Sequence, residues 1–346
     1  MKVFLGMSGG VDSAVSAHLL KEQGHEVVGV YMKNWSKDLP GMKCPWAEDL
    51  ADAKRTAVRL GIDFRVFDFE SDYKQKVVDY MLAEYQKGNT PNPDIMCNQE
   101  IKFKLFAETA FEQGAELIAT GHYAKSKGRQ LLCAKDTNKD QSYFLYRITA
   151  DVIERTLFPV GDMLKSEVKA LAENIGLTVA HKPESMGVCF VGEANMKDFL
   201  AEFVETRPGK IIELETNTEL GIHDGAIFYT LGQRHGLGLT QGLPYYVVKK
   251  DMAKNLVYVS RNLNAGKLWA NRATLRDVVF RESASGPLQA RIRHRAPLVP
   301  AHFDAETQTV YFDDAQKSLT PGQSVVLYRG PLCLGGGIIE STDKVC

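Results

Sequence analysis

The sequence predicts an α/β protein in which a parallel sheet covered by helices is followed by a small central domain and an all-β, barrel-like C-terminal domain. Through about residue 205, short apolar runs alternate with segments whose apolar residues recur three and four positions apart, as strands alternating with helices do. After about residue 206, short alternating stretches separated by Asn, Asp, Gly and Pro take over, and no helical period is found beyond about residue 271. The predicted domains are therefore 1–205, 206–270 and 271–346.

Within the first domain we expect four strands, over residues 2–6, 25–32, 62–69 and 116–120, each rich in Val, Ile and Phe. Helical periods fill the intervals between them. Strand and helix in alternation favour parallel pairing, with helices on both faces of the sheet. Glycine readily takes the left-handed conformation that ends many helices, and four helices are expected to end in this way, at Gly24, Gly61, Gly114 and Gly176.

Composition and charge exclude several classes of protein. The chain has 346 residues, with 44% hydrophobic and 25% charged residues, which are ordinary globular values and exclude a disordered, collagen-like or coiled-coil chain. Lys and Arg number 42 against 43 Asp and Glu, so the net charge is −1 and speaks only weakly against a polyanionic partner, because it averages over all faces. No apolar run reaches the ~20 residues of a membrane span or forms a signal peptide.

The six cysteines form no Cys-x-x-Cys pair and no Cys/His cluster, which excludes a zinc ribbon and a dense disulfide framework. Sparse cysteines are typical of a reducing compartment. Together with the absence of a signal peptide, this predicts a cytoplasmic protein.

A glycine-rich turn, residues 6–13, directly follows the first predicted strand and opens the first predicted helix. Backbone N–H groups at such a helix start, together with the hydroxyls of Ser8 and Ser13, are suited to bind phosphate oxygens. The turn contains no lysine and no Gly-Lys-Ser/Thr follows it, which excludes a Walker A loop. We therefore predict a phosphate-binding turn of another kind.

Two cysteines lie in settings that favour chemistry. Cys97 falls in the stretch 90–98, which contains two prolines and is expected to lead into a helix near Cys97, and a thiol at a helix start has a lowered pKa. Asp94, three residues earlier, is a candidate acid or base. Cys189 lies between glycines in the stretch 182–193, which shows no clear period and is expected to move. A buried structural role is the alternative for an isolated cysteine. The remaining thiols are assigned to packing or to the surface: Cys44, Cys133, Cys333 and Cys346.

Seven motifs, in order and in spacing, resemble the bacterial tRNA-specific 2-thiouridylase family, whose catalytic domain is an N-type ATP pyrophosphatase. The motifs lie at residues 6–13, 90–98, 119–124, 138–145, 185–193, 230–238 and 333–339. The resemblance covers essentially the full chain and implies a Rossmann-like pyrophosphate-loop domain. It also implies an activity, the ATP-dependent 2-thiolation of uridine 34, the wobble base, in tRNA for Lys, Glu and Gln.

The family's chemistry implies that ATP, with Mg²⁺, adenylylates the C2 oxygen of that uridine. Cys189 would carry sulfur as a persulfide taken from a cysteine desulfurase or a sulfur-carrier relay protein. Cys97 would attack or resolve this persulfide and leave a transient Cys97–Cys189 disulfide. Asp94 would handle the proton, and Asp12 would lie near Mg²⁺ or the pyrophosphate; no resident metal site is expected.

The resemblance also implies two sets of binding residues. Those for ATP are Gly6, Met7, Ser8, Gly9, Gly10, Val11, Asp12, Ser13, Met32 and Gly121. Those for the target base and the tRNA are Asn92, Pro93, Asp94, His122, Lys139, Asp140, Gln141, Arg293, His294 and Gln323.

The last predicted domain carries one further signal of an anionic partner. We expect strands there over 289–295, 308–312 and 324–328. Arg291, Arg293 and Arg295 alternate, so on a strand they would share one face, as phosphate-binding arginines do. An ordinary solvated face of a barrel strand is the alternative interpretation.

Two other classes of function stay open. A ligase or amidotransferase acting on a small molecule uses the same pyrophosphate loop and would need neither Cys97 nor Cys189. A non-catalytic RNA-binding or redox module would use the cysteines only for a disulfide or, with Asp94, for an iron–sulfur cluster. The absence of a Cys-x-x-Cys pair weighs against the cluster.

Overall fold

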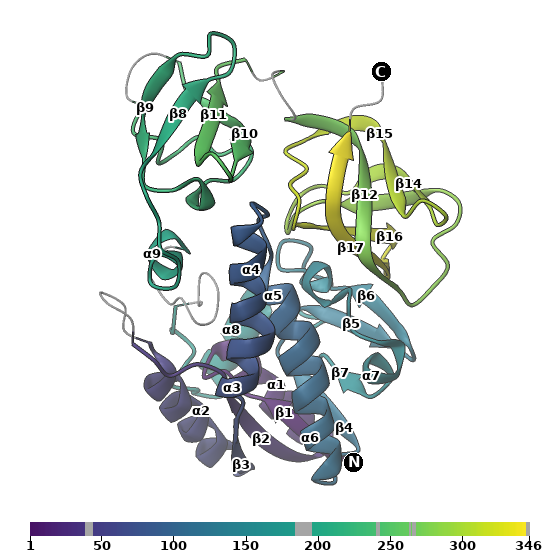
Figure 1. Cartoon of the computed structure of the whole chain (residues 1–346). Coiled ribbons are helices and arrows are strands. Elements are labelled where there is room, and N and C mark those ends of the chain that lie inside the picture. Colours follow the sequence, from purple (N-terminus) through teal and green to yellow (C-terminus); the bar gives the residue numbers. More distant parts are fainter. Residues whose placement is uncertain (39–43, 184–195, 240–242, 263, 265–267, 344–346) are drawn as a thin grey trace.

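Three sheets organise the chain in the computed structural model, which describes residues 1–38, 44–183, 196–239, 243–262, 264 and 268–343. The first sheet lies near the N-terminus, the second above it at one side, and the third forms a barrel at the other side (Figure 1). Within the described ranges, no helix combines the length and the apolar character that a membrane crossing requires.

The N-terminal sheet is parallel throughout and has the strand order β3-β2-β1-β4-β7. The predicted parallel sheet is therefore confirmed, with strand ends within about two residues of those expected. The short β7 was not predicted. The strands are β1 (Lys2–Gly6), β2 (Glu26–Lys33), β3 (Asp63–Asp68), β4 (Leu117–Thr120) and β7 (Thr156–Leu157).

Helices cover both faces of this sheet, because successive side chains of a strand point to opposite sides. Val3 and Leu5 pack in the same cluster as Ala17 of α1 (Val11–Glu22) and Ala53 of α2 (Trp46–Leu60). Phe4 packs on the other side with Phe106, the first residue of α6 (Phe106–Glu112). The glycine-rich turn after β1 therefore rests on a sheet that is buried on both faces.

Helix α8 (Lys165–Asn174) packs against α1, and two long helices, over residues 70–86 and 93–112, are each continuous through several of the segments named here. The four predicted helix ends are confirmed, since Gly24, Gly61, Gly114 and Gly176 have φ between +61° and +87°. The other helical segments are α3 (Glu70–Tyr73), η1 (Lys74–Asp79), α4 (Tyr80–Gln86), α5 (Pro93–Met96), η2 (Cys97–Leu105), η3 (Ser142–Leu145), α7 (Ala150–Glu154), α9 (Met196–Ala201) and η4 (Ala226–Phe228).

The central sheet has the order β10-β11-β8-β9, with β8 and β11 parallel and the other pairs antiparallel. Its small core contains Ile211, Val247 and Val257. The predicted mostly-β character of this part is confirmed. The strands are β8 (Gly209–Glu213), β9 (Glu219–His223), β10 (Tyr246–Asp251) and β11 (Leu256–Ser260).

The C-terminal sheet closes into an antiparallel barrel, because β12 pairs with β15 at one edge and with β17 at the other. Leu275, Val325 and Ile339 lie in its core. The predicted barrel is confirmed. Its strands, in chain order, are β12 (Trp269–Phe280), β13 (Leu288–Arg291), β14 (Val299–Asp304), β15 (Thr309–Lys317), β16 (Ser324–Arg329) and β17 (Leu332–Asp343).

A hairpin from the N-terminal part extends the barrel sheet. Strand β5 (Ala124–Lys127) pairs with β6 (Gln130–Cys133), and β6 pairs with the start of β17 through Leu132 and Leu332. The sequence predicted no strand here. Residues that follow β4 directly are thus built into the C-terminal sheet.

The predicted strand over 289–295 is wrong in its second half. Strand β13 ends at Arg291, the N–H of Ala296 bonds to the carbonyl of Arg293, and Arg295 has φ +63°. The chain turns here ahead of Pro297, so the three arginines do not share a strand face. Alternating charge alone did not distinguish a strand from a turn.

Candidate active site

The glycine-rich turn, residues 6–13, lies where the strand order of the parallel sheet reverses. From β1 the chain proceeds to β2 and β3 on one side and then returns to β4 on the other side. In open parallel sheets, ligands bind beyond the carboxyl ends of the strands at such a point. Gly6 pairs with Thr120 in register, so the glycine-rich turn after β1 and Gly121 after β4 lie side by side.

The turn is tightly packed against its neighbours. Gly9 has φ +76°, and a Cβ on it would overlap the backbone carbonyl of Asp49. A Cβ on Gly121 would lie 2.8 Å from the backbone nitrogen of Ser13. Helix α1 begins at Val11, and its first N–H groups have no acceptor within the helix. Glycine at these two positions therefore allows close backbone packing around the turn, and the helix N-terminus that the turn opens offers N–H groups to an anion.

Three of the residues expected to bind ATP have side chains that are used inside the protein. Met7 and Val11 are 2% and 4% exposed and belong to the core. The side chain of Met32 packs against Gly6, where an added Cβ would lie only 2.8 Å from the Met32 Cε. Met7 and Val11 can therefore offer a nucleotide only their backbone groups.

Asp12 is already paired within the structure. The Nζ of Lys165 lies 2.7 Å from its Oδ1 and 2.8 Å from its Oδ2, and the hydroxyl of Tyr123 donates to Oδ1 at 2.8 Å. Neither Lys165 nor Tyr123 was among the predicted site residues. Lys165 is 153 positions away in the sequence, so no local pattern indicates the contact.

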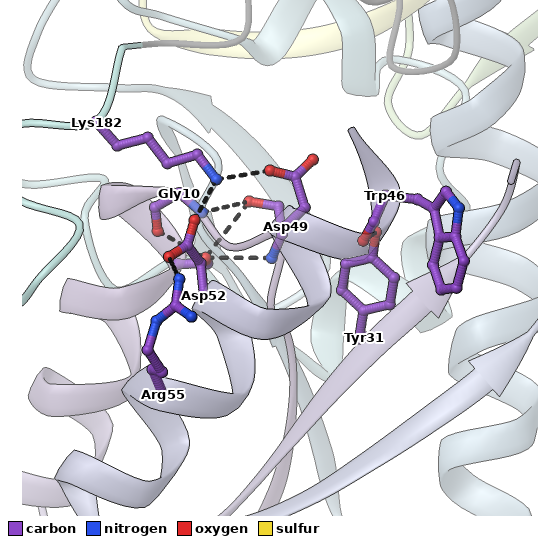
Figure 2. A network of polar contacts seen from close by, with 9 residues as sticks. Gly10, Tyr31, Trp46, Asp49, Asp52, Arg55 and Lys182 are labelled. Atoms are coloured by element: carbon purple, nitrogen blue, oxygen red, sulfur yellow. Dashed lines mark hydrogen bonds and ion pairs between the residues drawn. The ribbon is translucent and has the colours of Figure 1, made fainter. Parts of the chain in front are cut away.

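A second lysine, Lys182, contacts acidic residues in the first turns of α2. Figure 2 shows Lys182 reaching Asp49 and Asp52, with Nζ–O distances of 2.7 and 2.6 Å, while Arg55 also contacts Asp52. Burial by itself raises the pKa of Asp52, but the hydrogen bonds from Lys182 and Arg55 hold that pKa below its ordinary value. This charged network fixes the helix turn against which Gly9 packs.

The proline-containing loop leads into a helix earlier than expected. Helix α5 begins at Pro93, and the Asn92 side chain caps it by accepting hydrogen bonds from the N–H groups of Asp94 and Ile95. The prediction that the helix begins near Cys97 is therefore wrong, because proline at the first helical position starts it four residues sooner. Cys97 is 2% exposed and lies a full turn into the helix, where the helix dipole acts more weakly.

Asp94 and His122 lie in the field of one cation, Lys102. Burial raises the pKa of Asp94, and the nearby charge of Lys102 partly opposes this rise. Burial and the same charge lower the pKa of His122 well below its ordinary value, so the imidazole is neutral at pH 7. His122 directly follows Gly121 and contacts the hydroxyl of Thr120 at 2.9 Å. The ring of His122 also packs on that of Phe103 in η2, with ring centroids 5.7 Å apart, so the residue after Gly121 contacts the helical segment that begins at Cys97. Lys102 was not among the predicted site residues.

Cys189, the second cysteine predicted to be catalytic, lies outside the described residues, so the predicted Cys97–Cys189 disulfide stays a prediction. Among the described residues, Cys44, Cys97, Cys133 and Cys333 form no disulfide. Burial raises the pKa of Cys133 to about 11 and that of Cys333 to about 12, which makes both poor nucleophiles. No group of three or more His, Cys, Asp or Glu residues suited to a metal ion is found in the part of the chain that the structure describes.

Lys139 and Asp140, two of the residues expected to contact tRNA, lie at the seam where the N-terminal part packs against the barrel. Asp140 is 3% exposed, and its Oδ2 lies 2.7 Å from Nη1 of Arg291 and accepts a hydrogen bond from Ser142. Lys139 lines an open hollow of about 490 Å³ together with Arg291 and Arg295. Asp140 is therefore engaged inside the protein, whereas Lys139 belongs to a basic surface.

The other predicted tRNA residues lie around the same seam and near the start of helix α5. His294 packs on the ring of Phe144, and Arg293 donates to the backbone carbonyl of Lys317. Gln141 accepts a hydrogen bond from the N–H of Tyr123. Gln323 lies further along the barrel and donates to the carbonyl of Thr90, which precedes helix α5.

Comparison with known proteins covers the whole chain. Three domain families match it: the tRNA methyl transferase HUP domain over residues 1–193, the tRNA methyl transferase PRC-barrel domain over 197–261, and the aminomethyltransferase beta-barrel domain over 272–339. A solved 4-thiouridine synthetase–RNA complex with bound ATP is similar over 58% of this chain and 50% of that chain, at 20% identity and a TM-score of 0.38.

Full-length relatives are more similar. The tRNA-specific 2-thiouridylase of Listeria welshimeri is 43% identical over 99% of this chain and 96% of its own length. That of Haemophilus ducreyi is 46% identical over 99% of this chain and 94% of its own length. The resemblance found in the seven motifs is thereby confirmed over the full chain, and the protein belongs to the tRNA-specific 2-thiouridylase family of sulfur-transferring enzymes.

Proposed function

We propose that this chain uses ATP to 2-thiolate uridine 34, the wobble base, in tRNA for Lys, Glu and Gln. The observation that carries the proposal is the meeting of two sites at His122. This residue directly follows Gly121, which packs against the glycine-rich turn, and its ring contacts that of Phe103 in η2, the helical segment that begins at Cys97. This contact supports a single site for the activated base and the Cys97 thiol. The predicted division of labour assigns both chemical steps to residues 1–205 and tRNA contact to residues 271–346.

In the first step the C2 oxygen of the uridine attacks the α-phosphorus of ATP, the bond to the β-phosphate oxygen breaks, and pyrophosphate leaves. An oxygen at C2 of uracil is a poor leaving group, and adenylylation corrects this. The N–H groups at the start of α1 are suited to bind phosphate oxygens, and Asp94, with its raised pKa, is suited to take the proton lost from N3 of the base. Mg²⁺ would neutralise phosphate charge, and the carboxylate of Asp12 is the hard oxygen donor that the turn offers it.

In the second step the terminal sulfur of a Cys189 persulfide attacks C2 and AMP leaves. The thiolate of Cys97 then attacks the Sγ of Cys189. The bond between this Sγ and the sulfur on C2 of the base breaks, and a Cys97–Cys189 disulfide forms. The base keeps one sulfur and regains its N3 proton. An external thiol must reduce the disulfide before the next turnover, and a cysteine desulfurase or a sulfur-carrier protein must reload Cys189. We propose that the reaction takes place in the cytoplasm, with the tRNA.

The decisive experiment is mass spectrometry of wobble nucleosides in tRNA from cells in which the gene is deleted and then restored. We expect 2-thiouridine to disappear on deletion, to return with the wild-type gene, and to stay absent with Cys189→Ala or Cys97→Ser. Cys44→Ser is the matched control, because Cys44 is a half-buried thiol outside the loop and should restore the modification. An unchanged thiouridine signal in the deletion strain would favour the small-molecule ligase instead.

A further inference from the structure

The motif at residues 230–238 contains none of the residues expected to bind ATP or tRNA, and it forms a well-fixed loop in the central part of the chain. Its three glycines have φ between +68° and +82°, a conformation that residues with a Cβ rarely adopt. The side chain of Gln233 accepts a hydrogen bond from the N–H of Thr230 and donates one to the carbonyl of His235. The loop is therefore held in shape by its own backbone and side chains.

This loop presents two nitrogen-bearing side chains to solvent, Arg234 and His235. Both are exposed, whereas Leu237 is 6% exposed and belongs to the core of the central part. Nη2 of Arg234 lies 3.3 Å from Nε2 of His235. Because a guanidinium can only donate, Nε2 accepts this hydrogen bond and Nδ1 carries the imidazole proton. Within the described ranges Arg234 forms no ion pair with a carboxylate, so its charge is available to an anion.

The loop contacts the segment that leads into helix α5. The hydroxyl oxygens of Thr230 and Thr90 lie 3.2 Å apart, and Thr90 lies two residues before Asn92, which caps the helix that carries Asp94. Asn92 and Asp94 are expected to contact the target base. The loop therefore lies next to the place where the wobble base is expected.

The loop also contacts the barrel, at Ser318. A Cβ on Gly232 would overlap the side chain of Ser318. Nη2 of Arg293, one of the residues expected to contact tRNA, lies 3.3 Å from the carbonyl oxygen of the same Ser318. Arg293 and the loop that carries Arg234 thus contact one barrel residue from two parts of the chain.

The stretches that meet around Ser318 carry no negative side chains. Three of them lack Asp and Glu entirely: residues 225–250, 283–303 and 315–339. Arg291 and Arg295 line the hollow beside Lys139, and Arg293 lies between them in the sequence. Arg234 therefore extends a basic surface from the barrel onto the central part, although the whole chain has a net charge of only −1.

We propose that Arg234 and His235 bind a backbone phosphate of the tRNA anticodon arm, so that the central part holds the RNA beside the segment that leads into helix α5. This assignment deepens the proposed function and rests on it. The guanidinium offers a fork of N–H donors that matches phosphate oxygens, and Nδ1–H of His235 offers one more donor. Such a contact positions the arm and adds affinity but reads no base.

An acidic surface of a protein partner is the other anion that two such side chains could bind. The loop favours RNA, because residues 230–238 expose no large apolar side chain. Protein interfaces depend on apolar or aromatic anchors near their centre, whereas a phosphate contact needs only N–H donors and positive charge.

Filter binding of a tRNA transcript at several salt concentrations tests this assignment. We expect Arg234→Ala to weaken binding on the order of fivefold and to reduce the slope of log affinity against log salt by about one. Arg234→Lys should keep the slope, because it keeps the charge. His235→Ala removes a neutral donor, so it should weaken binding and leave the slope unchanged. The control is Lys210→Ala, since Lys210 is an exposed cation of the same part that pairs with Glu219 at 2.8 Å.

An isolated anticodon-arm hairpin locates the contact. Arg234→Ala should weaken binding of the hairpin as much as binding of the full tRNA. A loss with the full tRNA alone would overturn the placement on this arm, and an unchanged salt slope would overturn the phosphate contact. Unchanged tRNA binding together with slower sulfur loading by a cysteine desulfurase or a sulfur-carrier protein would also overturn it, and would assign the loop to that protein.

The proposed function fails separately from this assignment. If the wild-type protein binds tRNA but forms no 2-thiouridine when ATP and a sulfur source are added, the thiolation proposal is wrong, while the salt slopes still decide the role of Arg234. If the wild-type protein binds no tRNA, both proposals are wrong.

Discussion

The amide nitrogen Nε2 of Gln323, in the C-terminal barrel, donates a hydrogen bond to the carbonyl oxygen of Thr90, 2.7 Å away, two residues before the helix cap Asn92. The N–H of Thr90 in turn donates to the carbonyl of Pro321 at 2.9 Å. Thr90 also contacts the hydroxyl of Thr230, which belongs to the central part of the chain. The segment that leads into helix α5, which carries Asp94 and is followed directly by Cys97, is therefore held from both C-terminal parts.

We expect Gln323→Ala to loosen this loop. A net hydrogen bond contributes about 0.5–1.5 kcal/mol to folding stability, so urea unfolding should show a loss of this size. Because a misplaced catalytic group is costly, the single-turnover thiolation rate should fall on the order of tenfold. The control is Gln316→Ala, whose amide bonds only to the carbonyl of Asp314 in its own strand. A Gln323 that acts only as a tRNA contact would instead raise KM and leave both the rate at saturation and the stability unchanged.

Neighbouring residues at the seam should give opposite results. Asp140→Ala removes one partner of the buried pair with Arg291, which typically costs about 3–5 kcal/mol of stability. Lys139→Ala should change stability by less than about 0.5 kcal/mol, but it should weaken tRNA binding and reduce the salt slope of that binding by about one. Urea unfolding and filter binding at several salt concentrations measure the two effects. Weak tRNA binding by a fully stable Asp140→Ala protein would contradict this assignment and place Asp140 at the tRNA surface.

The parts of the fold that follow from local pattern were predictable from the sequence. The strands of the first sheet and the helix ends at glycines depend on residues a few positions apart, and the structure confirms them. The start of helix α5 was missed because two competing local signals lie in one stretch, and the Asn92–Pro93 cap outweighs the later residues. The barrel arginines were misread for a related reason, since a turn ahead of Pro297 ends the strand at Arg291.

Contacts between distant residues were not predictable from one sequence. Lys165 meets Asp12 across 153 positions, and Lys182 meets Asp49 across 133. Nothing in the local sequence of either lysine distinguishes it from an exposed surface lysine, because its burial depends on how α8 and α2 pack against the glycine-rich turn. The candidate site was therefore predictable as a set of loops, and its electrostatics were not.

His294 should make the stability of the protein depend on pH. Burial, followed by the charges of Arg295 and Arg291, lowers the pKa of His294 from an ordinary 6.5 to about 4. As the pH falls below 6.5, the unfolded chain takes up a proton that the folded chain takes up only near pH 4. Stability is therefore fully present above pH 6.5 and is lost as the pH falls toward 4. His294→Gln should show a smaller loss between pH 7 and pH 5 in urea unfolding; an equal loss in both proteins would contradict the prediction.

Lys102 should set the acid side of the pH–rate profile. Because its charge lowers the pKa of Asp94, Lys102→Met should raise that pKa further. If Asp94 accepts a proton during adenylylation, the rate rises with pH as Asp94 ionises, and this rise should shift to higher pH in the variant. Lys102→Arg should restore the wild-type position. Asp94→Asn should lower the rate by about 10²–10⁴-fold and remove the rise. A rise at the same pH in wild type and Lys102→Met would assign it to another group.

Glu84 links the end of α4 to the barrel and to the residue before Thr90. Its side chain is 3% exposed, with Oε2 2.6 Å from Nη2 of Arg276 in β12 and 2.8 Å from Nδ2 of Asn89. Burial by itself raises the pKa of Glu84, but hydrogen bonds from Lys87 and Asn89, together with the charge of Arg276, hold it below the ordinary 4.5. The pair therefore adds stability above pH 4.5 that is lost as the pH falls through the lowered pKa.

We expect Arg276→Ala to destabilise the protein at neutral pH by less than the about 3–5 kcal/mol typical of a broken buried pair, because Lys87 still donates to the Glu84 carboxylate at 2.9 Å. Arg276→Ala with Glu84→Gln should recover part of this loss, since a neutral amide is cheaper to bury. Because Asn89 precedes Thr90, Arg276→Ala should also slow thiolation more than Arg272→Ala. Arg272 lies in the same strand as Arg276, and its substitution breaks an exposed pair with Asp343. Equal rates in the Arg276 and Arg272 variants, measured in single turnover with saturating tRNA, would contradict this prediction. They would show that the Glu84–Arg276 pair does not support the segment that leads into helix α5.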